Sequence, residues 1–206
     1  MNLIDILQTL AIFCVFLFSV ILHEISHGYI AYKLGDPTAK ISGRLTLNPK
    51  SHIDPFGSII LPLTLYFFSF LGGPKIIFGW ARPVPYNPLN FKNFKKDVIK
   101  VALAGPLSNL FLAIIFSFIF RLNIFPQGGQ EFLQNIIYIN VLLGVFNILP
   151  IPPLDGSKIL VLFFPKGKEH WLFYLEIYGI FLIFILIFFL WPIVKFFVYL
   201  IYSILI

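Results

Sequence analysis

The sequence contains few charged residues and a single cysteine. Only 12% of its 206 residues are charged and 59% are hydrophobic, whereas about a quarter of a soluble globular domain is charged. Cys14 alone excludes a disulfide framework and a cysteine-rich metal site. The formal charge of +6 predicts no nucleic-acid partner, because the basic residues lie in the connections between apolar runs.

Long apolar runs and 26 phenylalanines dominate the rest of the chain, whose mean hydropathy is +0.92. The apolar runs cover residues 6–34, 56–71, 98–120, 132–154 and 171–191. We therefore expect an all-α polytopic membrane protein with about five transmembrane helices in one domain, residues 1–206, and the lipid bilayer as its surroundings. The last run should end at Trp191 and Pro192, and residues 193–206 are short for a span.

The connections predict smaller elements. Residues 40–48 alternate in the manner of a short strand, and residues 73–97 predict a small β-like hairpin or loop at the membrane surface. The first run has no positively charged leader before it and no small-residue cleavage site after it, so we expect it to be a retained span. No internal repeat is evident.

A metal-binding motif, HEISH, lies inside the first apolar run. On a helix, His23 and His27 share one face, one turn apart, so both imidazoles reach a single zinc ion, and Glu24 reaches a water beside it. This pattern indicates metal-assisted peptide hydrolysis. The alternative is a helix end whose polar side chains lie in the interfacial layer.

A third ligand would strengthen the zinc hypothesis. The remaining candidates are His52, His170, Glu176 and Asp155. Asp155 follows LPIPPL, where the prolines prevent a regular helix, and unwound backbone at membrane depth occurs only inside protein or beside a wet cavity. Asp155 is thus a credible ligand, and the alternative is a solvated carboxylate at a helix end.

HEISH, NPKSHIDPFG, GWARPVPYNP, AGPLSNL and FNILPIPPLDG together resemble the site-2 protease family of intramembrane zinc metallopeptidases, over residues 15–160. The likeness is greatest to its compact branch without PDZ or CBS domains. The resemblance implies one zinc ion held by His23, His27 and Asp155, with Glu24 as the catalytic residue. It also implies that Asn147 binds substrate or stabilises the oxyanion. The catalytic core would span residues 6–160, with a membrane anchor at 171–206.

The ligand positions restrict the topology. For Asp155 to meet His23 and His27, one of the runs 56–71 and 98–120 must fail to cross the membrane. The run 56–71 is short, contains Pro62 and lies between glycines, so we expect it to be re-entrant or interfacial. The basic residues then gather on the active-site side, while Arg121 and Lys195 lie opposite. The positive-inside rule therefore places the active site at the cytoplasmic face of a multi-pass cell-membrane protein.

Three polar positions inside or beside the runs leave alternatives open. From spacing alone, Asn140 and Asn147 are equally suited to oxyanion binding and to interhelical hydrogen bonds. Gly105 and Pro106 interrupt their run and favour close packing and a kink, with Asn109 facing the site. His52 is either a gating group or a locally bonded loop residue.

These observations favour an endopeptidase that cleaves within transmembrane segments, with membrane proteins or signal-peptide remnants as substrates. Residues 73–90 could pair with an unwound substrate as an added strand. The alternatives are a zinc transporter and a non-catalytic scaffold. The intact Glu24 argues against the scaffold, and the absence of a repeat argues against the transporter. The sequence does not indicate an oligomeric state.

Overall fold

The computed structural model describes residues 3–70, 81–165, 167–168 and 171–206. Those residues form helices and no strand. The elements in chain order are α1 (Leu3–Lys33), α2 (Thr38–Ile41), η1 (Pro49–Ser51), η2 (Pro55–Ile60), α3 (Leu61–Phe70), η3 (Pro88–Asn90), α4 (Phe94–Arg121), α5 (Gln127–Ile148), η4 (Asp155–Phe163) and α6 (Trp171–Leu205).

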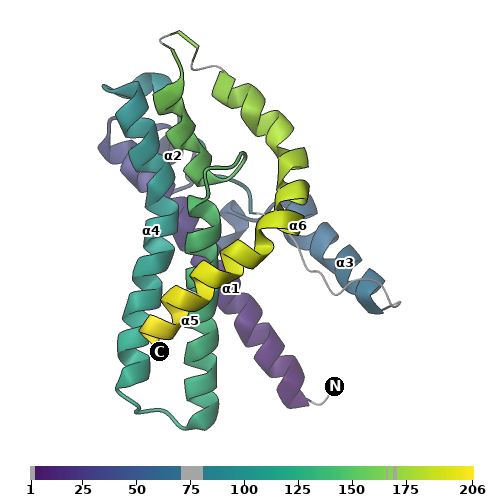
Figure 1. Ribbon diagram of the computed structural model, residues 1–206. Helices are drawn as coiled ribbons and strands as arrows, with labels where there is room; N and C mark the ends of the chain where they lie inside the picture. Colours follow the sequence, from purple (N-terminus) through teal and green to yellow (C-terminus); the bar gives the residue numbers. More distant parts are fainter. Residues whose placement is uncertain (1–2, 71–80, 166, 169–170) are drawn as a thin grey trace.

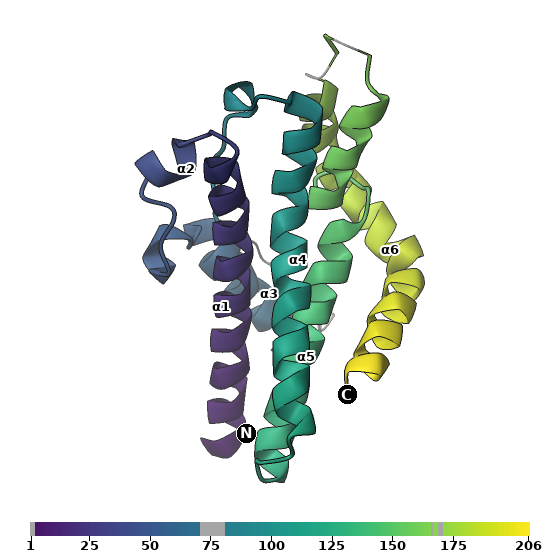
Figure 2. The same ribbon diagram turned by 90° about the vertical axis from the view of Figure 1, so that its left-hand side faces the viewer.

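Three long helices form the centre of the molecule, with α4 packed between α1 and α5 (Figure 2). Within the described residues, α1, α4 and α5 are the helices long and apolar enough to cross a membrane. The end of α1, the start of α4 and η4 lie at one end of the bundle, and the α4–α5 connection lies at the other (Figure 1). The chain between α1 and α4 therefore leaves and returns at the same end.

The two ends of that connection are fixed by local chemistry. Gly35 has φ +105°, a conformation that favours glycine, and Asp36 N donates to Ala31 O at 3.0 Å to close the last turn of α1. At the start of α4, the Asn93 side chain caps the first turn, and Asp97 in turn accepts from Asn93 N at 3.0 Å. The predicted helix end near Leu34 is confirmed.

The connection differs from the expected strand. Asp36 accepts hydrogen bonds from the Thr38 N and Oγ1 atoms, which starts the short helix α2, and Gly43 at φ +65° ends the turn that follows it. The strand predicted at 40–48 is therefore wrong, because side-chain bonding overrides the alternating pattern. The hairpin lies partly at 71–80, outside the described residues, and 81–87 contains no strand. The re-entrant placement of 56–71 stays a prediction.

Two other expectations at prolines are also corrected. The helix α4 continues through Gly105 and Pro106 without a break, and α6 continues through Pro192 to Leu205 instead of ending there. Figure 1 shows that α6 changes direction along its length, which agrees with the lost hydrogen bond and steric demand of an internal proline. Val194 and Val198 beyond that proline are buried against α4 and α5, so packing holds the last turns in place.

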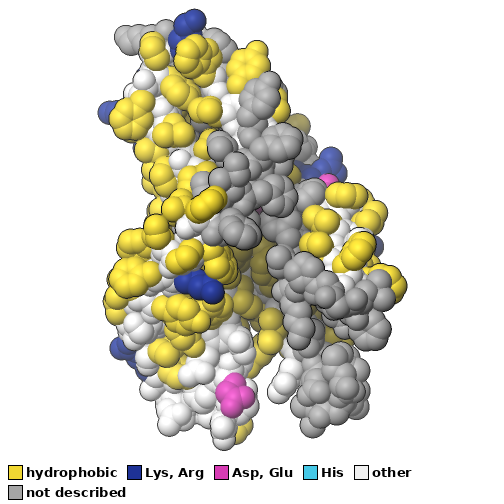
Figure 3. Space-filling model, turned by 45° about the vertical axis from the view of Figure 1, so that its right-hand side comes forward, with side chains coloured by type: hydrophobic (Ala, Val, Ile, Leu, Met, Phe, Trp, Pro, Cys, Tyr) yellow, Lys and Arg dark blue, Asp and Glu magenta, His cyan; other side chains and the backbone are white. Residues whose placement is uncertain are grey.

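The surface is as apolar as a lipid-facing protein requires. Exposed large hydrophobic side chains lie along α1, α3, α4 and α6, for example Phe13, Phe67, Phe118 and Phe196. Figure 3 shows hydrophobic side chains over much of the described surface on one face, with isolated Lys and Arg among them. The polar side chains buried inside the bundle are therefore the exception that needs an explanation.

Candidate metal centre

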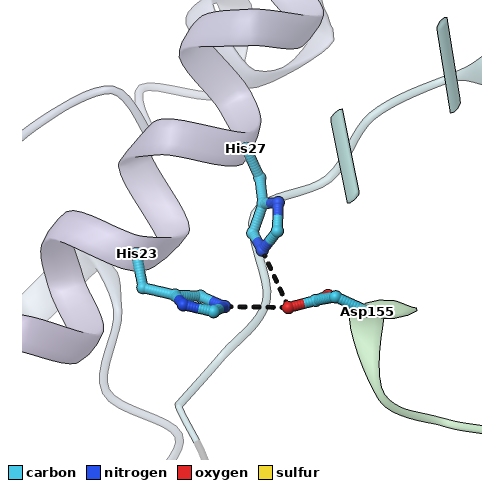
Figure 4. Close-up of side chains that lie close together, drawn as sticks. All are labelled: His23, His27 and Asp155. Atoms are coloured by element: carbon cyan, nitrogen blue, oxygen red, sulfur yellow. Dashed lines mark hydrogen bonds and ion pairs between the residues drawn. The ribbon is translucent and has the colours of Figure 1, made fainter. Parts of the chain in front are cut away.

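The two histidines of HEISH lie on one face of α1, as the helical spacing predicts. His23 and His27 are only 6% and 7% exposed, and their ring centroids are 4.7 Å apart. Their Nε2 atoms face away from α1 toward the chain that follows α5 (Figure 4). Two imidazoles buried among apolar helices need polar partners, because an unpaired polar group is costly there.

The third member reaches the histidines because the chain unwinds after α5. The helix stops at Ile148, and Pro150, Pro152 and Pro153 exclude a further α-helical turn before Asp155 opens η4. The Asp155 Oδ2 atom lies 2.9 Å from His23 Nε2 and 3.2 Å from His27 Nε2 (Figure 4). The predicted convergence of these three side chains is confirmed.

Outer hydrogen bonds fix how both rings are turned. His23 Nδ1 lies 2.6 Å from Asn109 Oδ1, and His27 Nδ1 lies 2.7 Å from the carbonyl oxygen of Val101. Both partners on α4 are acceptors, so each Nδ1 carries a proton and each Nε2 is the ring nitrogen whose lone pair can bind a metal. This is the arrangement that ligating histidines adopt around metals.

The Asn109 amide extends this support into a second helix. Its Nδ2 donates to Ser19 O at 3.2 Å and to Asn140 Oδ1 at 3.1 Å, and Asn140 in turn donates to Ile136 O. Asn109 and Asn140 are fully buried. A continuous chain of side-chain amide hydrogen bonds thus links α5 and α4 to the His23 ring on α1.

The donor set fits a zinc ion. One ligand atom from each of His23, His27 and Asp155 lies within 4.8 Å of the other two, and the two measured contacts approach the separation of about 3.4 Å expected between tetrahedral zinc ligands. Within the described part of the chain, the buried His27 Nε2 atom has no hydrogen-bond partner. This nitrogen atom lies beside a second imidazole and a carboxylate, and zinc prefers ligands of these two kinds.

A glycine on α4 makes room for this cluster. A Cβ atom at Gly105 would lie 2.6 Å from His23 Nε2 and would also overlap His27 Nε2. No side chain larger than hydrogen therefore fits without moving the atoms that face Asp155. The close approach predicted at Gly105 is confirmed, although its closest neighbours are the two imidazoles.

Glu24 is half-buried and is held from outside α1. Its Oε2 atom accepts a hydrogen bond from Val84 N at 2.8 Å, and its Oε1 accepts none from the residues described. Val84 belongs to residues 81–90, which we call the strap. The strap follows α1 from Glu24 to the helix end at Asp36. One carboxylate oxygen of Glu24 is thereby oriented while the other is available.

One side chain and one backbone hydrogen bond hold the start of the strap in place. The Arg44 guanidinium donates to the carbonyls of Arg82 and Pro83 at 2.6 and 3.2 Å, and Arg82 N donates to His52 O at 2.8 Å. His52 Nε2 bonds the carbonyl of Thr46 at 2.8 Å, which favours the local role expected as one alternative.

Asp36 fixes the far end of the strap. It accepts hydrogen bonds from Asn87 N and Asn90 Nδ2, both at 2.6 Å. Burial by itself would raise the pKa of Asp36, but hydrogen bonds from Thr38, Asn87 and Asn90 outweigh it and hold the pKa below its ordinary value. Asp36 is therefore a charged clasp between the end of α1 and the strap.

The remaining predicted residues have simpler surroundings. Asn147 is half-buried, and its Nδ2 donates to Leu143 O at 3.0 Å in its own helix, so its catalytic role stays a prediction. His170 lies outside the described residues, as does the side chain of Glu176. Sequence reasoning missed the contribution of Asp36 and Arg44. Their only local signal was their place in a polar connection next to the motif.

The chain is similar in sequence to proteins named as zinc metalloproteases. The model of "Peptidase family M50" matches residues 123–190. "Putative zinc metalloprotease YwhC" of Bacillus subtilis is 39% identical over 193 residues, which cover 86% of this chain and 82% of YwhC. "Putative zinc metalloprotease Rip2" of Mycolicibacterium smegmatis is 34% identical over 145 residues, covering 68% of this chain and 52% of Rip2.

An archaeal relative has a similar name. "Zinc metalloprotease MJ0392" of Methanocaldococcus jannaschii is 26% identical over 149 residues, covering 72% of this chain and 33% of that protein. No solved structure matches the chain significantly. Since YwhC is matched over most of both chains, the comparison shows that this chain belongs to peptidase family M50, the site-2 protease family, and is a zinc-dependent protease.

Proposed function

We propose that the protein is an intramembrane zinc endopeptidase that hydrolyses peptide bonds within or near transmembrane segments of other membrane proteins. His23, His27 and Asp155 hold one zinc ion in this proposal. The observation that carries it is the convergence of two buried Nε2 lone pairs and one carboxylate oxygen on a single point. Outer hydrogen bonds already fix both rings in the ligating orientation.

The residues divide the chemistry between them. When bound, zinc supplies Lewis acidity, which activates water and polarises a peptide carbonyl. Glu24, one residue from His23, takes a proton from the attacking water through the carboxylate oxygen that the strap leaves available, and passes it to the leaving amine. Asn147 donates from its amide to the carbonyl oxygen as negative charge develops there, after exchanging its bond to Leu143 O.

The proposed placement is in the cell membrane as a multi-pass protein, with the site near the cytoplasmic face. The site lies where α1 ends and where the α5 helix unwinds, at the end of the bundle that carries the basic connection 34–97. Because this connection leaves and returns at that end, a re-entrant or interfacial position for 56–71 follows naturally. The basic residues then lie on the cytoplasmic side.

Transmembrane helices and signal-peptide remnants are the proposed substrates, and the reaction is the cleavage step of regulated intramembrane proteolysis. A helix must unwind before its carbonyls are open to attack. From Arg82 to Pro85 the strap has no free N–H donor, because Arg82 N and Val84 N are bonded within the protein and both prolines lack one. Pairing of segment 73–90 with the unwound substrate would therefore use backbone N–H donors outside residues 82–85.

Glu24→Gln is the test. The purified full-length variant should retain one zinc per chain, because Glu24 is not a proposed ligand. Its cleavage of a single-span substrate with a glycine-interrupted helix and a cytoplasmic reporter should fall about 100- to 10,000-fold. Glu131→Gln is the matched control, since Glu131 is an exposed acid near the start of α5, whereas Asp155 follows the opposite end of that helix.

The same variants separate the alternatives. A zinc transporter or a scaffold would keep its activity with glutamine at position 24, whereas an endopeptidase would not. His23→Ala should lose zinc in elemental analysis together with activity. Full zinc content in His23→Ala, or wild-type cleavage in Glu24→Gln, would refute the proposal.

A further inference from the structure

A polar cavity lies beside the strap. Its volume is about 340 Å³, and six residues line it: Ser42, Gly43, Arg44, Ser51, Arg82 and Pro85. None of them belongs to the proposed zinc site. Two arginines, two serines and no acid form this lining, which is unusual for a surface where charges ordinarily alternate.

Arg44 is the residue that needs explaining. It is only 7% exposed, and its Nε–H has no hydrogen-bond partner among the described residues. Its Nη2 atom is occupied by the carbonyls of Arg82 and Pro83, so the guanidinium is held in place and cannot turn to find a partner for Nε. A buried donor left in this way costs free energy unless a ligand accepts from it.

The second arginine of the cavity, Arg82, also has no direct ion-pair partner among the described residues. Arg82 lies on the opposite wall, and within the described ranges neither arginine forms an ion pair with a carboxylate. Burial, and then the charge of Arg82, lower the pKa of Arg44 below its ordinary value, and the charge of the Glu24 carboxylate offsets part of this effect. The hydroxyls of Ser42 and Ser51 also make no hydrogen bond to the residues described.

We infer that this cavity, between the turn at Ser42–Arg44, Ser51 and the strap residue Arg82, is a binding site for a phosphate group. Two positive charges, of which Arg44 is held in place, and two hydroxyls without a described partner surround one space. A phosphate offers acceptor oxygens in several directions at once. Bound there, it would accept from Arg44 Nε and neutralise the repulsion between the arginines. Arg is suited to this role because its donors form a rigid fork.

The phosphate can come from a lipid headgroup or from solution. The surface beside the cavity favours a lipid, because Ile41 next to Ser42 is 80% exposed and Leu47 is 56% exposed. Apolar side chains around a basic pocket suit a position at the membrane interface, where acyl chains and headgroups are both within reach. The experiment below separates the two sources.

The test uses the full-length, zinc-loaded protein in an uncharged detergent. Native mass spectrometry would compare binding of dioleoyl phosphatidic acid with that of dioleoylglycerol, which lacks only the phosphate. Calorimetric titration with inorganic phosphate forms the second arm. Arg82→Gln removes one exposed charge of the cavity while leaving the backbone carbonyl that Arg44 holds. Lys92→Gln removes an exposed charge outside the cavity.

We expect the phosphate-bearing lipid to bind better than dioleoylglycerol. Arg82→Gln should weaken that binding about tenfold, the loss of one charge-assisted hydrogen bond, and Lys92→Gln should leave it unchanged. Binding in the lipid arm alone identifies a headgroup, and binding of inorganic phosphate with the same variant pattern identifies a free anion. No binding in either arm, or equal losses in Arg82→Gln and Lys92→Gln, would overturn the inference. Ser42→Ala, on the other wall, should weaken binding in the same direction.

Discussion

A substitution at Gly105 perturbs the candidate metal centre directly without replacing a proposed ligand. In Gly105→Ala, the added methyl would lie 2.6 Å from His23 Nε2 and overlap His27 Nε2, so both rings must turn away from Asp155. Alanine gains about 1 kcal/mol of helix propensity over glycine, while overpacking costs about 1–3 kcal/mol. The free energy of unfolding should therefore fall by only about 0–2 kcal/mol.

Zinc affinity should change far more than stability. Substitutions that disturb only the partners of ligands lower metal affinity about 10- to 100-fold, and this one displaces two proposed ligand atoms directly, so we expect a loss of about 100-fold or more. Chelator competition followed by elemental analysis would measure it. Thermal unfolding should be recorded with chelator present, so that zinc binding does not contribute to the Tm.

Gly128→Ala is the matched control for Gly105→Ala. It lies in the first turn of α5, where a Cβ atom would meet nothing within 4 Å, so it gains helix propensity without touching the site. Its zinc affinity should equal that of the wild type. A folded Gly105→Ala protein with wild-type zinc affinity would refute the assignment of His23 and His27 as ligands facing α4.

Three further predictions concern the supports of the site. Asn109→Leu removes the acceptor for His23 Nδ1, so zinc affinity in chelator competition should fall about 10- to 100-fold, and an unchanged affinity would mean that the ring is held otherwise. Asp36 has a lowered pKa in the folded protein, so its carboxylate stabilises the fold above the unfolded pKa of about 3.9, and this stability is lost as the pH falls through the folded value. In thermal unfolding scans, Asp36→Asn should therefore have a lower Tm than the wild type at pH 7, and a difference that persists undiminished at pH 3 would contradict this. Val84→Pro removes the N–H that orients Glu24, so turnover should fall about 10- to 100-fold at unchanged zinc content, and a wild-type rate would exclude an orienting role for the strap.

The parts of the site that follow from local rules could be predicted from the sequence. The four-residue spacing of His23 and His27 places them on one helix face whatever surrounds them. The prolines before Asp155 break α5 for a reason internal to the chain. These two features needed no knowledge of distant contacts, whereas the joining of His23, His27 and Asp155 into one ligand set came from the resemblance to the site-2 protease family.

The supports of those side chains depend on contacts between distant segments. Asn109 lies 86 residues from His23, and Val84 contributes only its backbone N–H to Glu24, which every residue except proline possesses. No residue type identifies such a donor in advance. The error at Pro192 has a related cause, because burial of Val194 and Val198 compensates there for the hydrogen bond that the proline removes.

The side-chain hydrogen bonds of Asn109 and Asn140, which join α5, α4 and α1, restrict where a proposed helical substrate can enter. Asn109 on α4 forms hydrogen bonds with the His23 ring and the Ser19 carbonyl on α1. A substrate helix inserted between α1 and α4 would break both bonds and leave the imidazole without its orienting partner. Substrate entry between α1 and α4 would therefore disrupt the metal site that the reaction needs. We therefore expect the interface between α1 and α4 to stay closed, and a substrate to enter from another side of the bundle.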